Sequence, residues 1–159
     1  MGKDVKTNAM RILDKAKAEY VAHHYSVDDG KIDGVSVADK MCYPYEMVYK
    51  TLVTVAPSKQ YYVFVIPVKE ELDLKKAAKS VGEKSVEMIH VADINKVTGY
   101  IRGGCSPVGM KKEYKTVIDE SVNSLDKFFV SAGKIGSQLE ISLKELGKVV
   151  KYEIYSIIQ

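Results

Sequence analysis

The sequence predicts an α+β protein in which a mixed, largely antiparallel β-sheet carries flanking helices. Runs rich in β-branched and aromatic residues alternate irregularly with single amphipathic helices, unlike the regular βαβ order of a parallel fold. The runs 50–55 and 61–68 are separated only by Ala56-Pro57-Ser58-Lys59, which has the composition of a turn, so they predict a hairpin. We expect this hairpin at the centre of the sheet.

Capping residues and hydrophobic periodicity define the other elements. Thr7 predicts the start of a helix that runs to about residue 18, Asp73 begins a helix that Gly82 ends, and Ser142 with Glu145 forms a capping box. Helices or helical turns are expected at 36–41, 44–49, 73–81, 91–97 and 142–149, strands at 20–25, 85–89, 116–119, 128–131 and 138–141, and an extended segment at the end of the chain.

Length and composition predict one globular domain that spans residues 1–159. The chain is 46% hydrophobic and 28% charged, and no apolar run is long enough to cross a membrane. Charged residues interrupt each apolar stretch near the start, so we expect no signal peptide and a cytoplasmic location. Cys42 and Cys105 are far apart in sequence, and we expect both to be free thiols in a reducing compartment.

The charge pattern limits the kind of nucleic-acid contact that is expected. The formal net charge is only +3, and Arg11 and Arg102 are the only arginines. A DNA-duplex binder is usually more basic. Lysines contact phosphates as point charges, whereas reading of base edges favours arginine. Any nucleic-acid contact is therefore expected with backbone phosphates.

Lys50 is the first candidate functional residue. Strand alternation places it on the same face as Val48 and Leu52, which is a buried face or the wall of a cleft. An ammonium group in a cleft needs an anionic or carbonyl partner. Alternatively, Lys50 extends to water or pairs with a carboxylate at the start of the strand. The strand pattern leaves both placements open.

Two glycine-containing segments are the next candidates. Four of the eleven residues 99–109 are glycine, so successive amides could converge on a carbonyl, carboxylate or phosphate oxygen, although a pair of tight turns fits equally. Lys111 and Lys112 follow, as phosphate ligands or as a solvated pair. The segment 130–136 carries Ser131 and Lys134 in what is otherwise an ordinary hairpin turn.

Other common chemistries lack their motifs. His23 and His24 point to opposite faces of a strand and have no metal-ligand spacing to His90 or the cysteines, so we expect no metal site. The sequence has no Gly-x-Ser-x-Gly elbow, P-loop or dinucleotide fingerprint, and it indicates no cofactor. Cys105 lies in the glycine-rich loop, where we expect a buried, inert thiol.

A resemblance adds to these expectations. It is carried, in order along nearly the whole chain, by the segments 50–53, 72–79, 84–88, 98–100, 103–109, 116–119 and 130–134. These segments closely resemble the YbaK/EbsC family of Cys-tRNA(Pro) deacylases, which is related to an editing domain of some prolyl-tRNA synthetases. The resemblance implies a barrel-like sheet and a trans-editing enzyme that binds the 3′ end of aminoacyl-tRNA(Pro), with Cys-tRNA(Cys) as a further substrate and prolyl-tRNA synthetase as a partner.

The resemblance also assigns roles to residues. Lys50 corresponds to the family's essential lysine, which binds the phosphate of the terminal adenosine or holds the aminoacyl ester. Backbone groups of Gly103, Gly104 and Gly109 would meet the reacting carbonyl. The implied substrate-binding residues are Tyr25, Thr51, Ser106, Pro107, Ser131, Gly133 and Lys134, of which the last three would flank the adenosine.

In the chemistry that the resemblance implies, the substrate's own cysteine thiolate attacks the ester and leaves as a cyclic thiolactone, so neither cysteine of the protein is required. Ile135 and Gln138 stand where the family pattern has a basic and an acidic residue, which leaves the periphery of the pocket and the amino-acid preference open. One alternative is a deacylase for another small amino acid, with Ala-tRNA(Pro) as an example of its substrate, because size alone discriminates between amino acids by only about 1 to 3 kcal/mol. The other alternative is a non-catalytic module that binds tRNA or a nucleotide.

Overall fold

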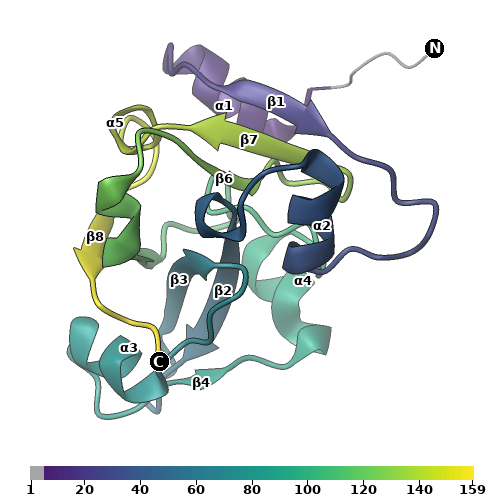
Figure 1. Cartoon of the computed structure of the whole chain (residues 1–159). Coiled ribbons are helices and arrows are strands. Elements are labelled where there is room, and N and C mark those ends of the chain that lie inside the picture. The colour runs from purple at the N-terminus through teal and green to yellow at the C-terminus, as the bar shows by residue number, and fades with distance from the viewer. Residues whose placement is uncertain (1–5) are drawn as a thin grey trace.

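The computed structural model describes residues 6–159, so the first five residues of the expected domain lie outside it. The strands form two sheets, the smaller above the larger in Figure 1. The three-stranded sheet has the order β1 (Val21–His24), β7 (Ser137–Ile141) and β6 (Phe128–Ser131). The five-stranded sheet has the order β4 (Glu87–Met88), β2 (Tyr49–Val55), β3 (Tyr61–Pro67), β5 (Lys115–Asp119) and β8 (Tyr152–Tyr155).

The pairing of the strands confirms the mixed, largely antiparallel α+β fold. Both pairs of the smaller sheet are antiparallel, as are β4 with β2 and β2 with β3, whereas β3 with β5 and β5 with β8 are parallel. The predicted hairpin is β2 and β3, and β3 is the central strand. Across residues 6–159 the two sheets do not close into a barrel, and a parallel bridge between Val48 and Phe129 joins them.

Local capping explains where the helices begin. Thr7 accepts a hydrogen bond from the Met10 amide at 3.2 Å, and Ser142 accepts one from the Glu145 amide at 3.2 Å, as predicted. The helices are α1 (Asn8–Lys15), α2 (Gly34–Met41), α3 (Leu74–Ser80), α4 (Ile94–Thr98) and α5 (Leu143–Leu146), with 3₁₀ turns at Tyr45–Met47, Val91–Asp93 and Glu120–Ser124. None of the helices in the described part of the chain is long and apolar enough to cross a membrane.

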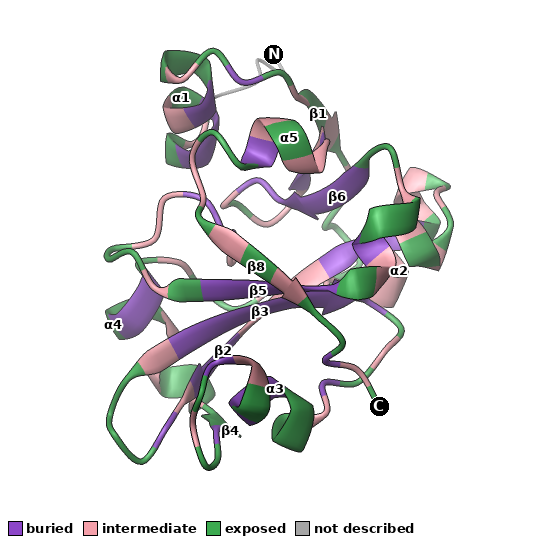
Figure 2. Ribbon diagram, turned by 90° about the vertical axis from the view of Figure 1, so that its left-hand side faces the viewer, coloured by how far each residue is buried: buried purple, intermediate pink, exposed green. Residues whose placement is uncertain are grey.

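The core lies on both faces of β3, which explains its continuous apolar sequence. Val63 and Val65 pack into the cluster between the two sheets, whereas Phe64 and Ile66 pack into a second cluster with α3. Figure 2 shows β3 and β5 as buried strands and α3 with an exposed outer surface. A third cluster lies where the sheets meet, and it contains Ala38, Val48, Val68 and Phe129. This junction places α2 beside the start of β2.

Candidate functional site

A pocket of about 830 Å³, here called the main pocket, lies beside the junction of the two sheets. The start of α2 and the segment before it form one wall, β2 forms another, and the segment 88–94, the glycine-rich loop and β6 with β7 complete it. Its lining residues are Gly30 to Val35, Val37, Val48 to Val53, Val68, Met88, Ile89, Val91, Ile94, Arg102, Gly103, Cys105, Ser131 and Gln138. The pocket therefore combines an apolar wall with a few polar groups, as ligand sites commonly do.

Lys50 lines the main pocket and is held only loosely by the protein. Its side chain is 30% exposed, and its Nζ lies 3.8 Å from Oε2 of Glu71, whose side chain is 75% exposed. A long ion pair with an exposed carboxylate is weak because water screens it. Lys50 therefore both lines a cleft and pairs with a carboxylate, which are the two placements that the sequence left open. Its ammonium can exchange Glu71 for an anionic group of a ligand.

The bridge between the two sheets brings Ser131 and Gln138 towards Lys50. Val48 is bridged to Phe129, and two residues further along each strand stand Lys50 and Ser131. Ser131 is paired in turn with Gln138 across β6 and β7. Paired residues of neighbouring antiparallel strands share a face of the sheet. This register explains why residues that are distant in sequence line one pocket.

Two buried polar atoms of the main pocket have no hydrogen-bond partner within residues 6–159. They are Oε1 of Gln138, a residue that is only 6% exposed, and Oγ1 of Thr51. A buried polar group without a partner costs about 1 to 3 kcal/mol. Both atoms are shielded from solvent, so a polar ligand would bond to them only after the neighbouring side chains move. Sequence reasoning connected Gln138 with the periphery of the pocket, as a departure from the family pattern, and did not list it as a binding residue.

The adjacent glycines of the loop differ in what they do. Gly103 lines the main pocket with φ of +88°, and a Cβ there would lie 2.8 Å from Cδ1 of Ile32. The amide of Gly104 donates to the carbonyl of Ile101 at 3.0 Å, and a Cβ on Gly104 would lie 3.2 Å from the Ile135 nitrogen. Gly103 therefore lines the pocket and leaves room for the Ile32 side chain, whereas Gly104 closes a turn and packs against 134–135.

Tyr100 explains two of the other glycines. Its hydroxyl donates to the carbonyl of Val108, and a Cβ on Gly109 or on Gly133 would lie 2.9 Å from the Tyr100 side chain. Burial, together with Cys105, raises the pKa of Tyr100 to about 12. Ser106 accepts from the Val108 amide at 3.2 Å. These contacts shape the loop, a role that the sequence pattern alone did not assign to Tyr100.

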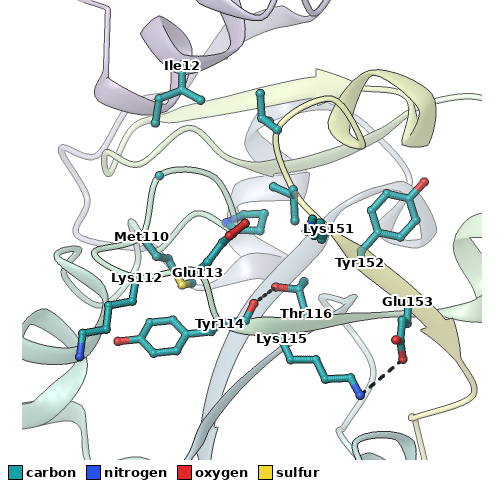
Figure 3. A pocket seen from close by; sticks show the side chains of 14 residues that line it. Ile12, Met110, Lys112, Glu113, Tyr114, Lys115, Thr116, Lys151, Tyr152 and Glu153 are labelled. Carbon is teal, nitrogen blue, oxygen red and sulfur yellow. Dashed lines mark hydrogen bonds and ion pairs between the residues drawn. The ribbon is translucent and has the colours of Figure 1, made fainter.

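Several of the expected site residues lie elsewhere. Pro107 and Gly109 line a second pocket of about 540 Å³, which Figure 3 shows beside Lys112, Tyr114 and Tyr152. The polar rim of this pocket includes an ion pair of 3.7 Å between Lys115 and Glu153. The expected site residues that line neither pocket are Tyr25, Gly104, Ser106, Gly133 and Lys134. The structure thus brings Lys50, Thr51, Gly103 and Ser131 together in one pocket lining, while Gly104 and Gly133 lie next to that lining, as the 3.1 Å hydrogen bond from the Gly133 amide to Oγ of Ser131 shows.

The cysteine and histidine side chains lie in contrasting environments. Cys105 lines the main pocket, and burial raises its pKa to about 11, although a hydrogen bond with Thr98 acts in the opposite direction. Its thiol is therefore protonated at neutral pH. On β1, Nε2 of His23 lies 2.8 Å from Oε1 of Glu140, and Nδ1 of His24 lies 2.9 Å from Oγ of Ser137. Both histidines are thus engaged with β7.

Comparisons with known proteins agree on one kind of domain. The family model of the aminoacyl-tRNA editing domain matches residues 34–149. A protein of Enterococcus faecalis, named as the Cys-tRNA(Pro)/Cys-tRNA(Cys) deacylase EbsC, is 44% identical over 137 residues, which are 86% of this chain and 84% of that protein.

Two crystal structures share the fold at low sequence identity. One is of a hypothetical protein, with a TM-score of 0.84, 19% identity and coverage of 94% of this chain and 97% of the other. The other is described as a trans-editing enzyme for prolyl-tRNA synthetase, with a TM-score of 0.79, 19% identity and coverage of 98% and 99%. At this identity they support the predicted fold class and no residue role.

Proposed function

The chain belongs to the family of aminoacyl-tRNA editing domains, as the sequence resemblance predicted, and from this premise we propose that it deacylates Cys-tRNA(Pro), with Cys-tRNA(Cys) as a further substrate. The observation that carries the proposal is the convergence of Lys50, Gly103 and Ser131 on one pocket. Its volume lies in the range of pockets that hold a small ligand, here the aminoacyl group and terminal adenosine. The name of the 44% identical relative supports the choice of substrate.

The proposed reaction needs no nucleophile from the protein. The thiolate of the substrate's cysteine attacks the carbonyl carbon of its own ester, and a carbon–sulfur bond forms. The bond from that carbon to the ribose oxygen breaks, and the oxygen takes up the proton that the thiol has lost. The products are tRNA with a free hydroxyl and a cyclic thiolactone. The protein contributes by holding the reacting groups together and by stabilising the charge that develops.

Four residues of the main pocket have roles in this proposal. The Lys50 ammonium binds an oxygen of the terminal adenosine's phosphate or of the ester, since its contact with Glu71 is easily exchanged. Gly103 places loop backbone in the pocket lining next to Ile32, where a larger residue would clash, and its backbone meets the ligand there. The unpartnered oxygens of Thr51 and Gln138 accept hydrogen bonds from the ligand, while the hydroxyl of Thr51 can also donate one.

Recognition of the rest of the tRNA forms the less specific part of the proposal. A net charge of +3 and the predominance of lysine favour contacts with phosphates and little reading of bases. We therefore propose that prolyl-tRNA synthetase supplies the selection of tRNA(Pro), and that the chain acts in the cytoplasm as one freestanding domain. Lys112 and Lys151, which are exposed at the rim of the second pocket, are candidates for phosphate contacts.

Replacing Cys105 with alanine is expected to leave the single-turnover rate of Cys-tRNA(Pro) deacylation within about threefold of the wild-type rate. With its pKa raised to about 11, the thiol is ionised in only about one molecule in 10⁴ at pH 7, so it is a poor nucleophile. The measurement is deacylation of a radiolabelled substrate by the variant and the wild type. A folded variant without activity would instead indicate a covalent intermediate on Cys105.

Single-turnover assays of the wild-type protein with Cys-tRNA(Pro) and Ala-tRNA(Pro) test the function itself. Loss of cysteine well above the uncatalysed rate, with slow loss of alanine, is the expected result. Faster loss of alanine would assign the chain to the alanine-specific alternative. Binding of both substrates with no acceleration of either would indicate a non-catalytic module, and the deacylase proposal would then fail.

A further inference from the structure

Lys40 makes an unusual set of contacts for a lysine near the end of a short helix. Its side chain is 19% exposed, and its Nζ donates to the carbonyl of Ser26 at 2.7 Å, to Oδ1 of Asp29 at 2.7 Å and to the carbonyl of Lys31 at 2.8 Å. An ammonium group has three hydrogens, so its donor capacity is completely used. All three acceptors belong to the segment 26–31, which links β1 to α2.

This segment contains no buried residue that could anchor it. Residues 26–31 are all exposed, and Val27, its most apolar member, is 40% exposed. Its other recorded hydrogen bonds are local, such as those from the Gly30 amide to the carbonyl of Val27 and from the Lys31 amide to Oδ1 of Asp29. Loops with few apolar contacts open easily. Lys40 therefore supplies the principal long-range hydrogen bonds that tie this segment to the fold.

The segment that Lys40 holds is a wall of the main pocket. Gly30, Lys31 and the next residue, Ile32, line the pocket. A Cβ placed on Gly103 would lie 2.8 Å from Cδ1 of Ile32, so Ile32 packs against the glycine-rich loop. The Lys40 ammonium also lies 5.9 Å from the ring centroid of Tyr25, at the end of β1. The hydrogen bond from Lys40 lowers the pKa of Asp29, so that carboxylate stays ionised at neutral pH. Charge-assisted hydrogen bonds of this kind are stronger than neutral ones.

We propose that Lys40 is a positioning residue, which fixes the segment 26–31 as a rigid wall of the main pocket and so holds the aminoacyl end of the substrate against Lys50 and Gly103. This inference rests on the proposed function and adds a specific residue to it. Lys40 does not line the pocket and touches no reacting atom. It acts through the loop, so its loss weakens the placement of the substrate and leaves the groups that stabilise the reaction in place.

The variant Lys40→Met tests the proposal because methionine keeps an unbranched side chain and removes the three donors. Lys79→Met is the matched control, since Lys79 lies exposed on α3, away from the main pocket. We expect Lys40→Met to raise KM for Cys-tRNA(Pro) about tenfold with kcat changed less than about threefold, and to speed amide exchange in 26–31 but not in β2 and β3. Lys79→Met should leave KM, kcat and amide exchange in 26–31 unchanged.

Two further variants keep the test decisive. Lys40→Arg keeps the charge and should recover part of the lost KM effect. Asp29→Asn weakens one of the three contacts without altering α2. It should shift KM and amide exchange in the same direction as Lys40→Met, by a smaller amount. If Lys40→Met does not fold, the result for Asp29→Asn decides whether the contacts of Lys40 position the loop. Unchanged exchange in 26–31, or faster exchange with unchanged KM, would overturn the proposal. If the wild type lacks deacylase activity, the proposed function fails, and the exchange data still decide whether Lys40 holds the loop.

Discussion

Lys50→Ala is expected to lower the single-turnover rate of Cys-tRNA(Pro) deacylation by about 10²-fold to 10³-fold, which is the range for loss of one preorganised charge-stabilising group. The pocket offers few substitutes for this ammonium. Lys31 and Arg102 also line it, but Lys31 lies in the segment before α2, and Arg102 lies on the glycine-rich loop. Neither occupies the position on β2 from which Lys50 reaches the ligand.

The fold of the Lys50→Ala variant should be close to that of the wild type. Lys50 is partly exposed, and its backbone pairing with Ile66 does not depend on the side chain. The melting temperature is therefore a useful control, as is Glu71→Gln, which removes the loose partner of Lys50 and should change the rate by less than about twofold. Wild-type turnover by a folded Lys50→Ala protein would remove Lys50 from the proposed machinery.

The fold was predictable where local signals were strong. The Thr7 cap and the Ser142 with Glu145 capping box predicted two helix starts, and the turn at 56–59 predicted the central hairpin. The boundaries were less accurate. The helix expected from 36 begins at Gly34, because Asp33 is the cap and accepts from the Ser36 amide at 3.1 Å. The helix expected to reach 149 ends at Leu146, and the 3₁₀ turn 120–124 was not expected.

The site was only partly predictable, because its members meet through pairing between strands that are distant in sequence. Alternation placed Lys50 on a candidate cleft face, but the bridge from Val48 to Phe129 decides that Ser131 and Gln138 lie nearby. Glycine content predicted either a backbone nest that approaches a ligand or a pair of tight turns. It could not distinguish Gly103, at the pocket, from Gly104, whose amide closes a turn.

The contacts of Lys40 show a second limit of sequence reasoning. In the sequence this residue is one of many lysines on a helix, where a solvated charge is the usual outcome. Its role arises because an exposed loop folds back over the helix and presents three oxygens to one ammonium. A contact of this kind has no periodicity, so a single sequence carries no signal for it.

Replacing the cysteine of the substrate with serine is expected to slow deacylation by about 10³-fold or more. Serine and cysteine are nearly the same size, and a pocket that sorts by size alone discriminates by only about 10-fold to 200-fold. A larger difference would require chemistry that sulfur performs and oxygen does not. A thiol ionises with a pKa near 8.5 in model peptides, so a useful fraction is thiolate at neutral pH, whereas a hydroxyl is a far weaker acid.

The measurement is single-turnover deacylation of Cys-tRNA(Pro) and Ser-tRNA(Pro) over a range of pH, with mass spectrometry of the released amino-acid product. For the cysteine substrate, the rate should rise about tenfold per pH unit below the pKa of the thiol and level off above it, and a thiolactone should precede free cysteine. Serine and cysteine rates within about tenfold of each other would indicate attack by water. In that case Thr51 and Gln138, which line the same pocket as Lys50 and carry unpartnered oxygens, would become candidates for orienting the attacking water.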